Sequence, residues 1–150
     1  MRNAFLLLPA LLLVGCQTAT QLTPPAGFVA VDAQRLGEYD YRAVSADGAV
    51  VAAAAETTSQ HGDLAFWSKA ASNQLQERGY KLVKQEDVTS TAGMKGQLLE
   101  FSQVRTGTPY SYFVAIFPVR NRVIRAEAGG KTEQLEPLRA EIVKSLLSVR

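Results

Sequence analysis

Residues 110–119 read YSYFVAIFPV, and this is the most strand-like run of the chain. Aromatic and β-branched residues dominate it, and these residue types favour the extended backbone of a β-strand. Successive side chains of a strand point to opposite faces, so Tyr110 and Tyr112 share one face while Phe113 and Phe117 share the other. One set should pack beneath helices, and the remaining tyrosines either line a groove or pack at the rim of the core.

A second strand should follow this one directly in an antiparallel hairpin. Arg120-Asn121 is a tight turn, and residues 122–128 alternate apolar with charged side chains. Gly129-Gly130 is expected to end the sheet.

Turn residues upstream divide the chain into further short strands. Asp47-Gly48 is a strong hairpin signal, while Gly93 and Gly96 indicate a loop and residues 106–109 a turn. Four consecutive alanines at 52–55 favour helix by propensity, but their place after the hairpin turn favours a returning strand. These upstream strands are expected at residues 28–31, 39–45, 49–56, 80–89 and 97–105.

The first helix is expected between Asp63, a good N-cap residue, and Gly79, which is typical of the position after a helix end. Its apolar residues recur at helical spacing, so they form one face that should pack on the sheet. This face comprises Leu64, Trp67, Ala71 and Leu75, widened by Phe66 and Ala70.

The second helix closes the chain. Thr132 is the expected N-cap, and Pro137 is tolerable only near the first turn. Leu135, Leu138, Ile142 and Leu146 form one apolar stripe. The order of elements predicts an α+β domain, with an antiparallel sheet of about five to seven strands and two helices packed on it.

The amino-terminal segment has the features of an export signal. Residues 1–3 carry one basic side chain, and residues 4–14 are apolar, with Pro9 among them. Eleven helical residues reach about 17 Å, whereas the hydrocarbon core of a bilayer is about 30 Å thick. A cleavable signal is therefore favoured over a membrane-spanning anchor.

Leu13-Val14-Gly15-Cys16 follows this apolar run and resembles the lipobox of bacterial lipoproteins. The resemblance implies cleavage between Gly15 and Cys16 and a diacylglyceryl group on the Cys16 thiol. The amino group of Cys16 that cleavage exposes is usually acylated as well. Cys16 is the only cysteine of the chain. The alternative is an ordinary secretory signal, which would leave a free thiol in an oxidising compartment.

Two or more acyl chains on Cys16 would anchor the protein stably to a membrane. Gln17 follows the cysteine, where an Asp would retain an enterobacterial lipoprotein in the inner membrane. The inner leaflet of the outer membrane is therefore favoured over the inner membrane. The expected organisation is a signal peptide at 1–15, a flexible lipid-anchored tether at 16–27 and a single domain at 28–150.

The charge balance argues against nucleic acid as a partner. The chain has 16 basic and 14 acidic side chains, and Arg2 is the only charged residue of the leader. Fifteen basic residues therefore face 14 acidic ones in the mature chain, which provides no general attraction for a polyanion.

The order of elements across residues 28–150 resembles the PsbP-like fold, a group that includes the extrinsic photosystem subunit and many small bacterial lipoproteins. The resemblance is clearest in residues 112–117, in the strand at 122–128 and in the closing helix. It implies a non-enzymatic accessory or assembly protein, and it transfers no ligand residues to this chain.

Catalytic and metal-binding patterns have little support in the sequence. His61 is the only histidine; Ser59, Asp63 and Ser68 are near it, but a Ser-His-Asp site depends on three-dimensional geometry. A solvent-facing histidine is favoured. Glu86-Asp87 is the only adjacent carboxylate pair, and neighbouring strand residues diverge, so no metal and no cofactor are expected. The segment 93–96 lacks P-loop spacing and is interpreted as a hairpin turn.

A cluster of arginines is the remaining candidate site. Arg120, Arg122 and Arg125 surround one hairpin, and Arg105 is expected to approach them across the sheet. Such a patch would meet lipid phosphates or acidic glycans. The alternative is a solvated hairpin end whose charges protect a sheet edge from aggregation.

Three functional hypotheses follow. The first is a lipid-anchored, non-enzymatic envelope protein that faces the periplasm and binds another envelope protein or glycan. The second is a carrier of a small molecule, glycan or lipid with a pocket between sheet and helix. The third, least favoured, is a hydrolase centred on His61.

Overall fold

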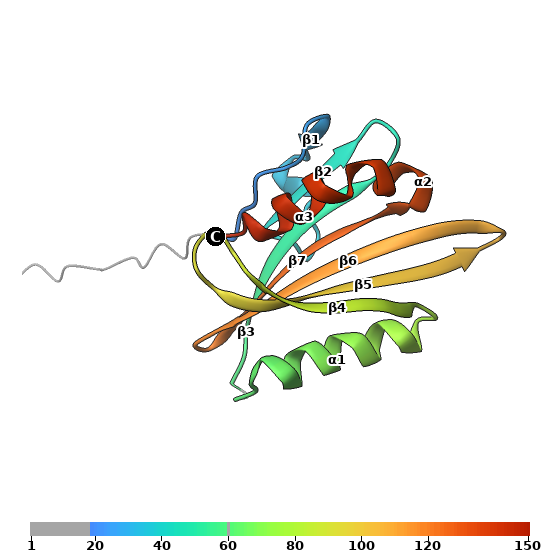
Figure 1. The fold of residues 1–150 in the computed structure, drawn as a ribbon. Coiled ribbons are helices and arrows are strands. Elements are labelled where there is room, and N and C mark those ends of the chain that lie inside the picture. Colours follow the sequence, from blue (N-terminus) through green and yellow to red (C-terminus); the bar gives the residue numbers. More distant parts are fainter. Residues whose placement is uncertain (1–18, 60) are drawn as a thin grey trace, which may run out of the picture.

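The computed structural model describes residues 19–59 and 61–150, which form one seven-stranded sheet with helices on both faces (Figure 1). The leader, Cys16 and Gln17 lie outside the described residues. All strand pairs are antiparallel, and the strand order is β1-β2-β3-β7-β6-β5-β4. The strands are β1 (Phe28–Ala30), β2 (Tyr41–Ser45), β3 (Val50–Thr57), β4 (Lys81–Thr89), β5 (Lys95–Arg105), β6 (Thr108–Val119) and β7 (Arg122–Lys131).

The two faces of the sheet have different covers. Helix α1 (Leu64–Glu77) lies on one face, and α2 (Thr132–Leu135) and α3 (Arg139–Leu147) lie on the other (Figure 1). Two short 3-10 helices, η1 (Ala33–Arg35) and η2 (Glu136–Leu138), complete the elements. The predicted α+β class is confirmed, with a number of strands at the top of the expected range.

The alanine-rich segment forms strand β3 and not a helix. It pairs with β7 over eight residues and with β2 on its other side. Ala52 and Ala53 are almost fully buried on opposite faces. Pairing with two distant strands therefore outweighs the local helix propensity of the alanines.

Three glycines expected in turns or at the sheet end lie inside strands. Gly96 belongs to β5, and a Cβ there would collide with the backbone of Ile116 and the ring of Phe117. Gly129 and Gly130 belong to β7, where a Cβ on Gly129 would lie 2.8 Å from the Tyr112 ring. These glycines allow large rings to lie against the backbone of a neighbouring strand. Reading glycine only as a turn signal does not reveal this role.

Helix α1 begins and ends as predicted, but its buried face is rotated. The Asp63 carboxylate accepts a hydrogen bond from the Phe66 N–H at 2.8 Å. Ser68, Ser72 and Leu75 are buried, whereas Phe66 is 50% exposed. Small serines let the helix approach the sheet, and Phe66 instead packs edge-on against Trp67 at 5.1 Å. Ala70 is also exposed, so Phe66 and Ala70 do not widen the packed face.

The closing helix is divided at Pro137. Helix α2 ends after one turn, η2 contains the proline, and α3 continues the path. Proline removes one backbone donor and clashes with the preceding turn, which accounts for the break. The N-cap is Lys131 and not Thr132, since the Thr132 hydroxyl hydrogen-bonds with the Ser111 hydroxyl at 2.9 Å.

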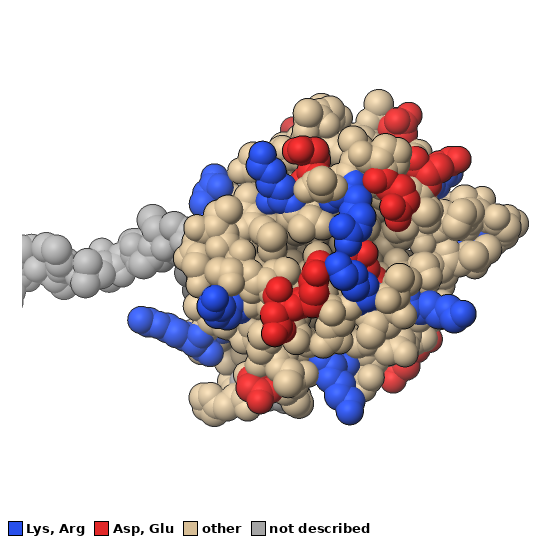
Figure 2. Space-filling view, in the orientation of Figure 1, with Lys and Arg blue, Asp and Glu red and all other residues tan. Residues whose placement is uncertain are grey.

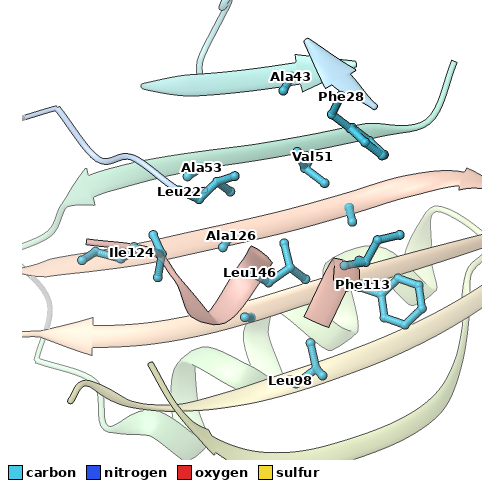
Figure 3. Close-up of a cluster of buried hydrophobic side chains, with 14 of the residues drawn as sticks. Leu22, Phe28, Ala43, Val51, Ala53, Leu98, Phe113, Ile124, Ala126 and Leu146 are labelled. Carbon is cyan, nitrogen blue, oxygen red and sulfur yellow. The ribbon is translucent and has the colours of Figure 1, made fainter. Parts of the chain in front are cut away.

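The main core lies between the sheet and α2–α3. Its side chains come from the inward positions of six strands and from the apolar stripe of the closing helix (Figure 3). Leu135, Ile142 and Leu146 are fully buried there, as the stripe predicts, while Leu138 packs at its edge. Phe113 and Phe117 face this core, and Tyr112 faces α1.

The described part of the expected tether is packed on the domain. Leu22 is 3% exposed and belongs to the main core. Gln21 exchanges two backbone hydrogen bonds with Arg150, and the Thr23 N–H donates to the Ser148 hydroxyl at 2.7 Å. This corrects the expected boundary at residue 28, because one apolar residue in a polar segment is enough to dock it.

Within residues 19–59 and 61–150, none of the helices has the length and apolar character that crossing a membrane requires.

Candidate binding site on the open face of the sheet

The face that α1 covers is only partly closed. Helix α1 packs on β4, β5 and β6, and this leaves the same face of β2, β3 and β7 without a covering helix (Figure 1). Alternation in β7 places Ile124, Ala126 and Ala128 in the main core, so Arg125 and Glu127 belong to the other face. We call the α1 side of the sheet, of which only one half is covered by the helix, the open face.

Glu127 is the centre of the open face. Its side chain is 8% exposed, although a carboxylate is rarely buried without partners. In the sheet it lies between Ala52 of β3 and Val114 of β6, and Arg42 of β2 pairs with Ala52 in the same row. The small alanine beside it leaves room for longer side chains to reach the carboxylate.

Both carboxylate oxygens of Glu127 are engaged. Oε2 accepts hydrogen bonds from the Tyr39 hydroxyl at 3.1 Å and from the Tyr112 hydroxyl. Oε1 forms an ion pair with the Arg125 guanidinium, which also pairs with Glu56 at 3.3 Å. Burial of the charge is thus compensated by one cation and two neutral donors.

These contacts shift the titration of the tyrosines. Burial, followed by the charge of Glu127 and the hydrogen bond to it, raises the pKa of Tyr39 to about 12. The same causes raise the pKa of Tyr112 further. Both tyrosines therefore remain neutral hydrogen-bond donors at neutral pH and do not act as bases.

The Arg125 guanidinium is held as a cation. Burial acts to lower the pKa of Arg125, but the carboxylates of Glu127 and Glu56 outweigh burial and the pKa is raised. Glu127, Arg125, Tyr39 and Tyr112 form a cluster of polar groups that contact one another and fix each other's side-chain positions. It contains neither an activated nucleophile nor a free base.

Pockets lie on both sides of this cluster. One, of about 360 Å³, lies between α1 and the sheet and is lined mainly by Trp67, Ala71, Ile116 and Val123, with Arg125 at its edge. A smaller one of about 240 Å³ lies over the cluster itself. The third, of about 560 Å³, lies beyond the end of α1 and is lined by tyrosines and arginines. The open face can hold a small ligand or an extended segment of a partner.

The four arginines predicted as one patch are not brought together. Arg105 lies at the β5–β6 turn, whereas Arg120 and Arg122 lie at the β6–β7 turn. The eleven residue steps of β6 between these turns correspond to roughly 36 Å. Arg125 belongs to the Glu127 cluster. Adjacency in sequence was misleading because antiparallel hairpins place successive turns at opposite ends of a sheet.

His61 has no catalytic surroundings in the described residues. Its side chain is exposed, the Asp63 carboxylate caps α1, and Ser68 is buried beneath that helix. Nor do residues 19–59 and 61–150 contain a group of three or more potential metal-ligating side chains.

Sequence reasoning missed Tyr39, Arg42 and Glu127 as functional candidates. The available signal was the pair Arg125 and Glu127, two residues apart and thus on one face of a strand otherwise rich in alanine. Tyr39 could not be found in this way, because it lies in a loop 88 residues before Glu127 in the sequence.

Charges on the outer surface are mixed. Basic and acidic side chains are interspersed over the face seen in Figure 2, without a large area of one sign. This distribution agrees with the near-neutral composition of the chain.

No family model matches the chain, and no curated protein matches it in sequence. Solved structures do match its fold. LpqN of Mycobacterium tuberculosis, described as involved in cell envelope biogenesis, has a TM-score of 0.65 at 15% identity, covering 85% of this chain and 79% of LpqN. The cyanobacterial PsbP protein of Synechocystis sp. PCC 6803 (CyanoP) has a TM-score of 0.62 at 10% identity, covering 88% and 92%. At these identities the likeness concerns the fold alone, and the fold is PsbP-like.

Proposed function

We propose that the protein is a lipid-anchored, non-enzymatic component of the bacterial cell envelope that binds another envelope component through its open face. The observation that carries this proposal is the combination of the Cys16 lipobox with a domain in which neighbouring side chains engage the buried Glu127 carboxylate. LpqN, a protein of the same fold, is described as involved in cell envelope biogenesis, which is in keeping with this proposal.

The position of the docked amino-terminal segment supports this arrangement. Four residue steps separate Cys16 from Thr20, which is buried on the domain, so the chain between them spans at most about 14 Å. Leu22 enters on the α3 side of the sheet, opposite the open face. A lipid on Cys16 would therefore hold the domain close to the membrane and leave the open face accessible from the periplasm. The favoured membrane is the outer one, at its inner leaflet.

A carrier function is the second candidate. The pocket of about 360 Å³ between α1 and the sheet favours it, because mainly apolar side chains line this pocket beside Glu56, Gln74 and Arg125. The two functions use the same face and differ in whether the occupant is a partner macromolecule or a released small molecule.

Metabolic labelling with a fatty-acid analogue tests the anchor. We expect the wild-type chain and the neighbouring Gln17→Ala control to be labelled and membrane-bound, whereas Cys16→Ser remains an unlabelled precursor. Labelling that persists in Cys16→Ser would contradict the anchor.

Crosslinking in intact cells tests the binding role. Recovery of the same envelope component in repeated experiments is the expected result. Repeated recovery without any specific partner, from correctly labelled protein, would count against a binding role and leave the anchor intact.

A further inference from the structure

The largest pocket of the open face is built from aromatic and cationic side chains. It has a volume of about 560 Å³ and is lined by four tyrosines and two arginines, which define the tyrosine pocket: Tyr39, Tyr80, Tyr110, Tyr112, Arg42 and Arg105. These residues come from the loop before β2, from β2 itself, from the entry to β4, and from both sides of the β5–β6 turn.

The rings form an ordered platform. Tyr80 and Tyr112 lie with ring centroids 5.5 Å apart, and Tyr80 also packs edge-on against the buried Phe101. The Tyr112 ring lies against Gly129, where a side chain would displace it. Tyr112 is further fixed through its hydroxyl by Glu127. A ligand would meet a surface that exists before it binds.

The two arginines of this pocket lack acidic partners. Across the described parts of the chain, no carboxylate forms an ion pair with Arg42 or Arg105. The Nε of Arg42 is buried and has no hydrogen-bond partner. The guanidinium of Arg105 lies 5.8 Å from the centre of the Tyr80 ring, and its Nε donates to Gln103.

The one carboxylate in the pocket wall does not neutralise these cations. Glu127 forms its ion pair with Arg125 and accepts hydrogen bonds from Tyr39 and Tyr112, and no ion pair joins it to either arginine of the pocket. Two guanidinium groups therefore face a cavity without a counter-ion. An isolated buried donor such as the Arg42 Nε is costly unless an acceptor occupies the site.

We propose that the tyrosine pocket binds a saccharide that carries a carboxylate, which deepens the proposed envelope-binding function and rests on it. Guanidinium groups match a carboxylate in geometry and charge. Each tyrosine offers an apolar ring and a polar hydroxyl, which match the C–H face and the hydroxyls of a sugar. Among the described residues, the hydroxyls of Tyr80 and Tyr110 bond to no protein group, so they can bond to the sugar.

A titration followed by NMR tests this site on the mature protein. The probes are N-acetylmuramic acid and N-acetylglucosamine, which differ by a carboxylate-bearing lactyl group. We expect saturable shifts of the Gly129 and Gly130 amide signals with the acidic sugar, and binding at least about tenfold weaker with the neutral one, because a hydrogen bond to a charged group is lost.

Matched arginine variants locate the carboxylate. Arg42→Gln and Arg105→Gln should each weaken binding of the acidic sugar at least about tenfold, and Arg120→Gln, at the far turn of the sheet, should leave it unchanged. Since Arg105 is exposed, Arg105→Gln remains informative even where Arg42→Gln fails to fold.

Several results would overturn the proposal. Equal binding of the neutral sugar, full binding by Arg105→Gln, or no binding by the folded protein would each exclude an acidic saccharide. Inorganic phosphate or lactate that binds as tightly as N-acetylmuramic acid would reduce the pocket to an anion site. None of these results affects the labelling of Cys16, so failure here is distinguishable from failure of the proposed anchor.

Discussion

The two faces of the sheet are built from the same strands but serve different purposes. On the α2–α3 face, aliphatic and aromatic side chains interlock into a continuous core that also includes Leu22 and Val149. On the α1 face, a smaller apolar cluster around Leu99 and Phe101 gives way to the Glu127 cluster and its pockets. Strand alternation makes this separation possible, because each residue along β6 and β7 contributes to only one face.

The main source of stability and the proposed binding role lie on different faces. The α2–α3 face, which we call the closed face, buries mainly apolar side chains, with the Glu100–Arg139 ion pair joining β5 to α3. Its contribution to stability therefore comes chiefly from the hydrophobic effect. The open face buries a carboxylate that needs an arginine and two tyrosines, an arrangement that adds little net stability. We infer that the closed face holds the domain together and that the open face was shaped by a ligand or partner.

Leu146→Ala should have the largest effect, since this side chain is fully buried in the closed face. We expect the free energy of unfolding to fall by about 2–5 kcal/mol, from lost transfer energy and the cavity that remains. Val123→Ala, in the wall of an open-face pocket, should cost less than about 1.5 kcal/mol. Urea unfolding measures both, and equal losses would remove the distinction between the faces.

Leu22→Ala tests whether the amino-terminal segment belongs to the closed face. We expect a loss of about 2–4 kcal/mol, although Leu22 precedes the first strand. The exposed Val29→Ala is the control and should change stability by less than about 0.5 kcal/mol. A loss at Leu22 no greater than at Val29 would restore the flexible tether predicted for residues 16–27.

Glu127→Gln tests the polar centre of the open face. Loss of this charge leaves Arg125 with only the exposed Glu56, and we expect a cost of about 1–3 kcal/mol. The surface pair Lys84–Glu86 provides the control, because Glu86→Gln should cost less than about 1 kcal/mol. If both substitutions have the same effect in urea unfolding, Glu127 is not a structural centre.

Tyr39→Phe should have the smallest effect, about 0.5–1.5 kcal/mol at neutral pH from the lost hydrogen bond to Glu127, and its distinctive pH dependence appears at alkaline pH. The pKa of Tyr39 is raised to about 12 in the folded protein, against about 10 in an unfolded chain. The neutral phenol therefore contributes stability that is fully present below about pH 10 and is lost as pH rises towards about 12. Unfolding free energies of Tyr39→Phe should decline less over this range than those of the wild type. Identical pH profiles would show that the shift is absent.

The closed face was largely predictable and the open face was not. Local patterns identified the strands, the Asp63 cap and the stripe of Leu135, Ile142 and Leu146. Alternation and helical spacing can both be detected within one short segment of the sequence. The sequence predicted one closing helix and not the break at Pro137. The docking of Leu22 could not be predicted, because no apolar periodicity surrounds this residue.

The candidate site depends on contacts between distant segments. Tyr39, Arg42 and Glu127 meet only after β2, β3 and β7 have paired in their register. The predicted arginine patch failed for the same reason, since register and not adjacency decides which turns are neighbours. Of its four members, Arg105 lines the tyrosine pocket and Arg125 the Glu127 cluster.

Position-specific photocrosslinking in intact cells tests the central claim that the open face is the binding face. A photoreactive residue would replace Gln74, which is exposed on α1 beside the open-face pockets, or Glu141, which is exposed on α3 and lines a pocket on that side of the sheet. We expect a reproducible crosslinked species from position 74 that the Arg105→Gln and Glu127→Gln substitutions reduce, and none from position 141. Equal crosslinking from both positions, or crosslinking from position 141 alone, would contradict it.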